Sequence, residues 1–177
     1  CTTCDYTITT TYNSNLNASN GSTICISSSG NLKGNLNGNN LTICNRGKIS
    51  STNFNANNYT MYNYGTVELS GLNVNNGNTI YNYGHVDIDG NLNVNNGGVI
   101  HNNFDLLVQG NLHVNGTVNG NTLGGYGKVT VYGTSTLNSN GSFGVTGNLD
   151  ICDTNNPTGG WHVKNGTEGV NVTHCER

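Results

Sequence analysis

The sequence has little charge, almost no proline and few large aromatics other than tyrosine. Only 8% of its 177 residues are charged, and proline and tryptophan each occur once. The net charge is -3 at neutral pH, and the six basic residues form no stripe that could follow a phosphate backbone. We therefore expect no nucleic-acid partner.

Long apolar runs are missing as well. No stretch approaches the roughly 20 apolar residues that a membrane-spanning helix requires, and no hydrophobic signal segment is present. We expect no membrane span, and if the protein is exported its signal has already been removed. The six cysteines, an even number in a polar chain with few lysines, favour an oxidising location over the cytosol.

Most of the chain consists of short alternating segments. Residues 79–98, TIYNYGHVDIDGNLNVNNGG, contain three runs in which apolar and polar residues alternate, each closed by Gly or Asn. This pattern predicts strand, turn, strand, turn, and no run is long enough for a helix. Residues 61–76 repeat it closely and residues 100–115 more loosely, with a period of roughly 19 residues.

A repeat of this length cannot bury its apolar face alone. Successive copies must therefore stack, each strand pairing in parallel with its counterpart one coil later. The predicted fold class is all-β: a single-stranded, right-handed parallel β-helix, or β-solenoid, of about 19 residues per coil with terminal caps. Roughly seven coils would give a rod on the order of 35 Å long.

The solenoid is expected over residues 22–152, and both flanking segments fall outside the repeat. Residues 1–21 would be an N-terminal strand that either caps the first coil or assembles with a neighbouring subunit. Residues 153–177 would form a C-terminal hairpin or cap around an Asn165-Gly166 turn, with Trp161 covering the last apolar layer.

One inward column of the predicted solenoid is polar. If Ile80 and Val86 point into the solenoid, the alternation of the strand places Asn82 inside as well. Stacked amides one coil apart can hydrogen-bond along the rod, which satisfies polar groups that would otherwise be buried at a cost. The expected structural ladder comprises Asn45, Asn63, Asn82 and Asn102.

Aromatic side chains occupy the outward positions of the same strands. The candidate binding face consists of Tyr62, Tyr64, Tyr81, Tyr83, His101 and Tyr126. Exposed aromatic surface can bind sugar rings or another protein, but cross-strand packing that stiffens an exposed sheet produces the same pattern. Both interpretations remain open at the level of the sequence.

The cysteines fall into a central pair and two terminal pairs. Cys25 and Cys44 stand in one outward column on adjacent coils, so their Cα atoms should lie about 5 Å apart and a disulfide between them is expected. The remaining candidates are Cys1, Cys4, Cys152 and Cys175. These would pair locally, Cys1 with Cys4 and Cys152 with Cys175, or join the ends of neighbouring subunits. The motif of a zinc site is incomplete, and we expect neither a metal nor a cofactor.

An acidic pair is the only candidate for catalysis. Glu68 and Asp87 should be neighbours on an outer face, where β-helical polysaccharide lyases and hydrolases place acids. The next coil has Leu107 in that column, and no arginine or lysine accompanies the pair. We expect no enzymatic activity, because acid and base chemistry requires a shaped, partly desolvated site. His85 beside Asp105 is interpreted as a surface pair.

The repeated segments IYNYG, HVDIDG and NLNVNNG support a comparison. They resemble the right-handed β-helical repeats of secreted bacterial surface proteins such as filamentous-haemagglutinin-like adhesins, over roughly residues 22–152. The resemblance implies export, a rod-like shape and an adhesive or structural role without catalysis. This chain is far shorter than such adhesins and carries cysteines near its ends.

Our leading hypothesis is a structural β-solenoid that is secreted, extracellular or at the cell surface of a bacterium. Its partners would be further copies of itself, in a head-to-tail homopolymer stapled by disulfides, or neighbouring domains of a surface fibre. The alternative is a monomeric adhesin domain that binds glycans through its tyrosine face. A polysaccharide lyase or hydrolase is the least favoured function.

Overall fold

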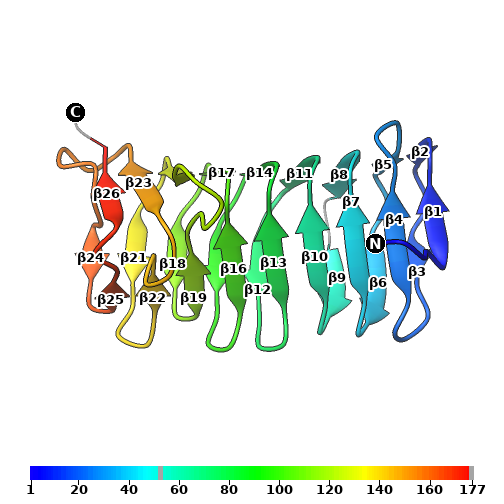
Figure 1. Cartoon of the computed structure of the whole chain (residues 1–177), viewed down its shortest axis with the longest axis horizontal. Helices are drawn as coiled ribbons and strands as arrows, with labels where there is room; N and C mark the ends of the chain where they lie inside the picture. Colours follow the sequence, from blue (N-terminus) through cyan, green and yellow to red (C-terminus); the bar gives the residue numbers. More distant parts are fainter. Residues whose placement is uncertain (52–53, 176–177) are drawn as a thin grey trace.

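The computed structural model describes residues 1–51 and 54–175. These residues form a parallel β-solenoid of about eight turns with about 20 residues per turn, and none of them is helical. Figure 1 shows the turns side by side along one axis, with the first turn at one end and the last at the other. The predicted fold class is confirmed as an all-β parallel solenoid.

Two continuous parallel sheets run the length of the rod. Sheet 1 contains β1 (Tyr6–Ile8), β4 (Thr23–Ile26), β7 (Thr42–Asn45), β10 (Thr60–Asn63), β13 (Thr79–Asn82), β16 (Val99–Asn102), β19 (Thr117–Asn119), β22 (Ser142–Phe143) and β25 (Thr167–Glu168). Sheet 2 contains β2 (Thr11–Tyr12), β5 (Asn31–Leu32), β8 (Lys48–Ser51), β11 (Thr66–Leu69), β14 (His85–Ile88), β17 (Asp105–Val108), β20 (Gly127–Val131), β23 (Leu149–Asp153) and β26 (Val172–His174).

The third strand of each turn belongs to one of two shorter sheets. Sheet 3 contains β3 (Leu16–Asn17), β6 (Leu36–Asn39) and β9 (Phe54–Asn57). Sheet 4 contains β12 (Leu72–Val74), β15 (Leu92–Val94), β18 (Leu112–Val114), β21 (Ser135–Leu137) and β24 (Val163–Lys164).

Alternation along each strand determines what the solenoid buries. In β13, Ile80 and Asn82 are buried while Thr79 and Tyr81 are partly exposed, and β10 and β16 show the same pattern. The parallel register places like residues one above another, as with Ile80 between Met61 and Ile100. Each turn therefore adds one layer of apolar side chains to a single continuous core.

The predicted asparagine ladder is confirmed. The amide nitrogens of Asn45, Asn63 and Asn82 each donate to the side-chain oxygen of the next ladder residue at 2.8 Å, ending at Asn102. The same three nitrogens each donate a second hydrogen bond to a backbone carbonyl in the next turn, for example that of Thr66. The buried amides are thus satisfied by their own repeats.

The N-terminal segment is part of the solenoid rather than an addition to it. Its strands β1, β2 and β3 pair in parallel with β4, β5 and β6, so residues 6–17 form a first turn. Residues 1–4 then run back over sheet 1 from β1 toward β7 (Figure 1).

The predicted C-terminal hairpin is wrong. Strands β24, β25 and β26 each pair in parallel with a strand of the preceding turn, so the segment is one more turn. Gly166 follows Asn165 for a packing reason, because a Cβ on Gly166 would lie 2.3 Å from the carbonyl oxygen of Asn138. The Asn-Gly pair marks a close approach between turns, which sequence alone does not distinguish from a hairpin turn.

Candidate functional site

Tyrosines of sheet 1 and of the corner that follows it form two stacks along the rod. Tyr62, Tyr81 and His101 stack in one column, with centroids 5.1 and 4.6 Å apart and rings 5° from parallel. Tyr64 and Tyr83 directly follow β10 and β13, at the corner before sheet 2, and stack on each other with centroids 5.0 Å apart. Five of the six predicted aromatic residues therefore lie on one face.

Stacking covers the ring faces that a sugar would contact. The two faces of Tyr81 contact Tyr62 and His101, which leaves ring edges and hydroxyls toward solvent. Burial lowers the pKa of His101, which favours the neutral imidazole in this stack. Burial also raises the pKa of Tyr83, and the neighbouring tyrosines add to this shift. This geometry favours cross-strand packing over a flat sugar-binding platform.

Tyr126 does not belong to this face. It lies in the loop between β19 and β20 and is 52% exposed. Together with His85, Phe104, Asp105 and Lys128 it lines a groove of about 340 Å³ at the corner between sheets 1 and 2. The expectation failed because the chain between β19 and β20 is longer than the corresponding corner of the preceding turns.

The predicted disulfide between Cys25 and Cys44 is wrong. The two residues are register partners in adjacent strands, as expected, but Cys44 bonds to Cys1 and Cys25 bonds to Cys4. The spacing of the repeat correctly predicted that Cys25 and Cys44 share an outward column. It contained no information about the N-terminal segment that lies over this column. Two bridges therefore fasten residues 1–4 to the second and third turns.

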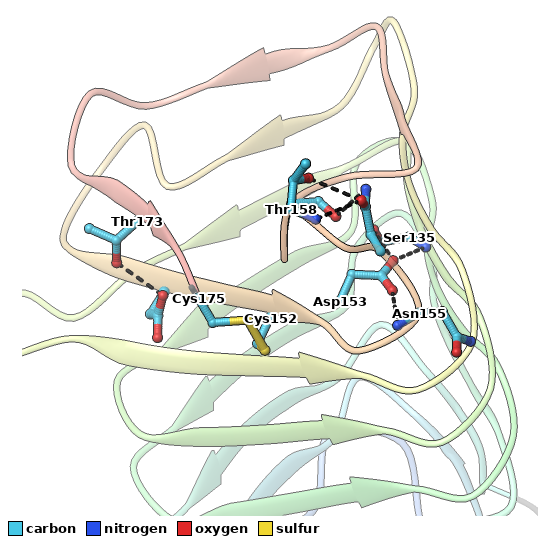
Figure 2. Close-up of a disulfide and its surroundings, with 10 residues drawn as sticks. Ser135, Cys152, Asp153, Asn155, Thr158, Thr173 and Cys175 are labelled. Atoms are coloured by element: carbon cyan, nitrogen blue, oxygen red, sulfur yellow. Dashed lines mark hydrogen bonds between the residues drawn. A yellow bond between two sulfur atoms is a disulfide. The ribbon is translucent and has the colours of Figure 1, made fainter. Parts of the chain in front are cut away.

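The local pairing of the C-terminal cysteines is confirmed. Cys152 lies in β23, Cys175 directly follows the neighbouring strand β26, and the two residues are bonded (Figure 2). All six cysteines are thus paired within one chain, and Cys1 does not pair with Cys4.

The acidic pair lies on an open surface. Glu68 and Asp87 are register partners, and Leu107 follows in the same column, as expected. The expectation that no base accompanies the pair is wrong, because Lys48 Nζ lies 2.7 Å from Glu68 Oε2. Lys48 belongs to the preceding turn, a neighbour that the solenoid register brings close.

His85 and Asp105 form the expected surface pair. They are register partners, and His85 Nδ1 lies 3.2 Å from Asp105 Oδ2, with both side chains more than 40% exposed. The ring of Phe104 meets His85 edge to face, with centroids 5.0 Å apart.

A buried carboxylate near the C-terminal end was missed from the sequence. Asp153 is fully buried in sheet 2 and accepts hydrogen bonds from the backbone and hydroxyl of Ser135 and from the backbone of Asn155 (Figure 2). The same carboxylate lies 2.6 Å from His162 Nδ1. The signal was a charged residue at an inward position, since Asp153 continues the column of Val131.

This constellation differs from a catalytic triad. The Ser135 hydroxyl donates to the carboxylate of Asp153, whereas a nucleophilic serine would contact the ring of the histidine. Ser135 is also fully buried, so its hydroxyl is closed to a substrate. The three groups stabilise the core at a site where two inward positions are polar.

The last turn has polar, ionisable side chains at positions that are apolar in the preceding turn. Lys164, Glu168 and His174 are the register partners of Leu137, Phe143 and Ile151, one on each side of the solenoid. Glu168 lies 3.2 Å from Lys164 Nζ and 2.9 Å from His174 Nε2, and it accepts a hydrogen bond from Trp161 Nε1. We call Lys164, Glu168 and His174 the terminal triad.

Burial alone would raise the pKa of Glu168. The hydrogen bonds from His174, Trp161 and Lys164 outweigh that effect and leave the pKa below its usual value. Trp161 packs edge to face on Phe143 and covers the last apolar layer beneath this carboxylate. The terminal triad was not found from the sequence because a hairpin was expected there.

Other classes of site have little support in the described residues. Across residues 1–51 and 54–175, no group of three His, Cys, Asp or Glu side chains is placed to hold a metal ion. The same residues include no helix long and apolar enough to cross a membrane. Comparisons with protein-family models, with curated proteins and with solved structures found no match to this chain.

Proposed function

We propose that this chain is a non-catalytic, extracellular structural rod that forms a segment of a bacterial surface fibre. The observation that carries the proposal is the continuity of sheets 1 and 2, each of which joins nine strands from the first turn to the last. A stack of this kind has no hinge between its turns, because every turn is bonded to both neighbours. Such a stack suits a spacer that holds its ends at a fixed separation.

The surface of the rod supports the same proposal. The tyrosine rings of sheet 1 pack on one another, and the acidic pair is open to solvent and neutralised in part by Lys48. Both arrangements stiffen or solubilise a sheet and leave no shaped site for acid and base chemistry. Three intrachain disulfides are compatible with an extracellular protein. The likeness to repeats of filamentous-haemagglutinin-like surface proteins points in the same direction.

The two ends of the rod differ in chemistry. At the N-terminal end the inward residues are Ile8, Tyr12 and Leu16, whereas the C-terminal end presents the terminal triad. Stacking one end directly on the other would bury Glu168 and its partners against apolar side chains. Desolvating such charges costs several kcal/mol per ion, so we propose that copies do not stack coaxially at neutral pH.

Sedimentation velocity tests the behaviour of the ends. The wild-type chain should sediment as a monomer under oxidising conditions, and a Lys164→Leu, Glu168→Leu, His174→Leu variant should associate as concentration rises. Linear polymers of the wild type at neutral pH would contradict the role given to the terminal triad.

Immunogold electron microscopy of intact source cells tests the function itself. Antibody against this chain should label thread-like structures on the cell surface, and antibody absorbed with purified protein should not. Label confined to the cytoplasm would overturn the proposal. Peptide mapping of the same extract under non-reducing conditions should recover the pairs Cys1 with Cys44, Cys4 with Cys25 and Cys152 with Cys175.

A further inference from the structure

The solenoid departs from its repeat at one corner between sheets 1 and 2. Two residues separate Asn82 from His85, and the second is Gly84. A Cβ on Gly84 would lie only 2.2 Å from the carbonyl oxygen of Gly65 in the preceding turn, so the corner requires glycine. In the next turn Phe104 occupies this place and is 48% exposed.

Phe104, at the position that Gly84 occupies one turn earlier, weakens the backbone contact at this corner. The backbone hydrogen bond from Asp105 N to Gly84 O is 3.4 Å long, whereas the equivalent bond one turn earlier, from His85 N to Gly65 O, is 2.9 Å. The chain therefore accepts a weakened backbone contact and an exposed aromatic ring at the same point. Local departures of this kind are concentrated at functional sites.

The following turn adds a loop at the same corner. Seven residues, 120–126, join β19 to β20, where two residues, 103 and 104, join β16 to β17. The loop exposes Leu123 by 75% and Tyr126 by 52%. Insertions in solenoids map to surface loops and are often used for binding.

This loop is held in place by a buried asparagine. Asn121 Nδ2 donates to the carbonyl oxygens of Asn103 and Gly124, and Asn121 Oδ1 accepts from the backbone of Leu123 at 2.7 Å. Asn148 from the next turn donates to the carbonyl of Gly125. The loop is thus organised before any ligand arrives, which lowers the entropic cost of binding.

Aromatic and polar groups meet in the groove beneath the loop. Phe104 and Tyr126 line it, and neither ring stacks in parallel on another ring among the described residues. The Asp105 carboxylate and the His85 imidazole lie on the same groove, with Lys128 as the register partner of Asp105. Within the described residues, no carboxylate lies within ion-pair distance of Lys128 Nζ.

We propose that this corner groove binds one ring of a neutral, gluco-configured saccharide. A pyranose with equatorial hydroxyls has an apolar C–H face that packs on aromatic rings, and its rim of hydroxyls bonds to charged side chains. Phe104 and Tyr126 provide the aromatic contacts, Lys128 donates to a hydroxyl and Asp105 accepts from one. A groove of about 340 Å³ lies within the size range of small-ligand sites.

The charges of the groove select against an acidic sugar. The carboxylate of Asp105 would repel a uronate carboxylate and offsets the attraction of Lys128, so the groove offers an acidic sugar no excess of positive charge. The proposal does not rest on the fibre function, because a saccharide site on this corner is possible with or without assembly into a fibre.

Nuclear magnetic resonance titration tests the site. The ¹⁵N-labelled chain would be titrated separately with hexasaccharides of β-1,4-linked glucose, β-1,4-linked N-acetylglucosamine and α-1,4-linked galacturonate. Saturable shifts are expected with at least one neutral sugar at residues 84–86, 103–106 and 122–128. No saturable shift with either neutral sugar, or tighter binding of galacturonate, would overturn the proposal.

Variants locate the contact. Tyr126→Ala and Phe104→Gly should each weaken binding by about tenfold or more, and Phe104→Gly restores the glycine of the repeat and so preserves the fold. Tyr132→Ala is the matched control, because Tyr132 is 49% exposed and lies outside the groove. Equal affinity in all three variants, or shifts that follow protein concentration in the absence of sugar, would contradict the assignment.

Discussion

Replacing Asn63 with alanine should remove the centre of the asparagine ladder. Asn63 is fully buried, and its amide nitrogen donates to Asn82 Oδ1 at 2.8 Å and to the carbonyl of His85 at 3.1 Å. Its side-chain oxygen accepts from Asn45 Nδ2 at 2.8 Å. The substitution therefore deletes three hydrogen bonds that water cannot replace.

The expected loss follows from these contacts. Each buried hydrogen bond contributes about 1 kcal/mol net, so the three bonds together account for about 3 kcal/mol. The two atoms that lose Asn63 keep one partner each: Asn45 Nδ2 still donates to the carbonyl of Thr66 and Asn82 Oδ1 still accepts from the backbone N–H of Gly84, which limits the additional cost. For a domain of this size, such a loss lowers the thermal midpoint by roughly 6 to 12 °C.

Urea and thermal unfolding, followed by circular dichroism, measure the effect. Asn93→Ala is the matched control, because Asn93 donates to Asn73 on the outer face, where water can replace the bond. We expect the control to lose no more than about 0.5 kcal/mol. Equal losses in the two variants would refute the reasoning, since burial of the ladder would then contribute nothing.

Three further predictions concern the ends of the rod. Asp153→Ala should cost about 3 to 5 kcal/mol in urea unfolding, because it leaves the polar groups of Ser135 buried without their acceptor, and a loss below about 1 kcal/mol would contradict this. Because the folded-state pKa of Glu168 is lowered, its contribution is complete above the unfolded pKa and is lost as pH falls through the folded value. The hydrogen-exchange protection factors of amides in β25 and β26 should therefore fall first on acidification. Glu168→Gln should abolish that pH dependence of protection, and an unchanged dependence would reject the assignment. Replacing Cys1 and Cys44 by serine should destabilise the chain by up to about 4 kcal/mol from the loop that the bridge closes, and an unchanged unfolding midpoint would count against a structural role for that bridge.

The repeat made much of the fold predictable from the sequence. Alternation identified the strands, the period identified the parallel stacking, and the shared column of Asn45, Asn63, Asn82 and Asn102 identified the ladder. These features are local or nearly periodic, so a single turn contains the information. The stacked tyrosines were located by the same argument, although only the ring geometry favoured packing over binding.

The features that depend on departures from the repeat were not predicted. Cys1 and Cys4 lie outside the periodic segment, so nothing in the spacing showed that they fold back onto sheet 1. The terminal triad occupies inward positions only when the last segment is aligned as one more turn, and Asp153 lies one residue beyond the expected end of the solenoid at residue 152. Phe104 was not identified from the sequence as a departure from the repeat, although the preceding turn has glycine, Gly84, at the equivalent position.

Small-angle X-ray scattering of a lengthened chain tests the central claim, that this protein is a rigid rod built of interchangeable turns. Residues 79–98 form one complete turn, because Thr79 is the register partner of Val99. Inserting two further copies of this segment should lengthen the particle by roughly 10 Å and leave its cross-section unchanged. A particle of unchanged length, or one that widens instead, would contradict the account.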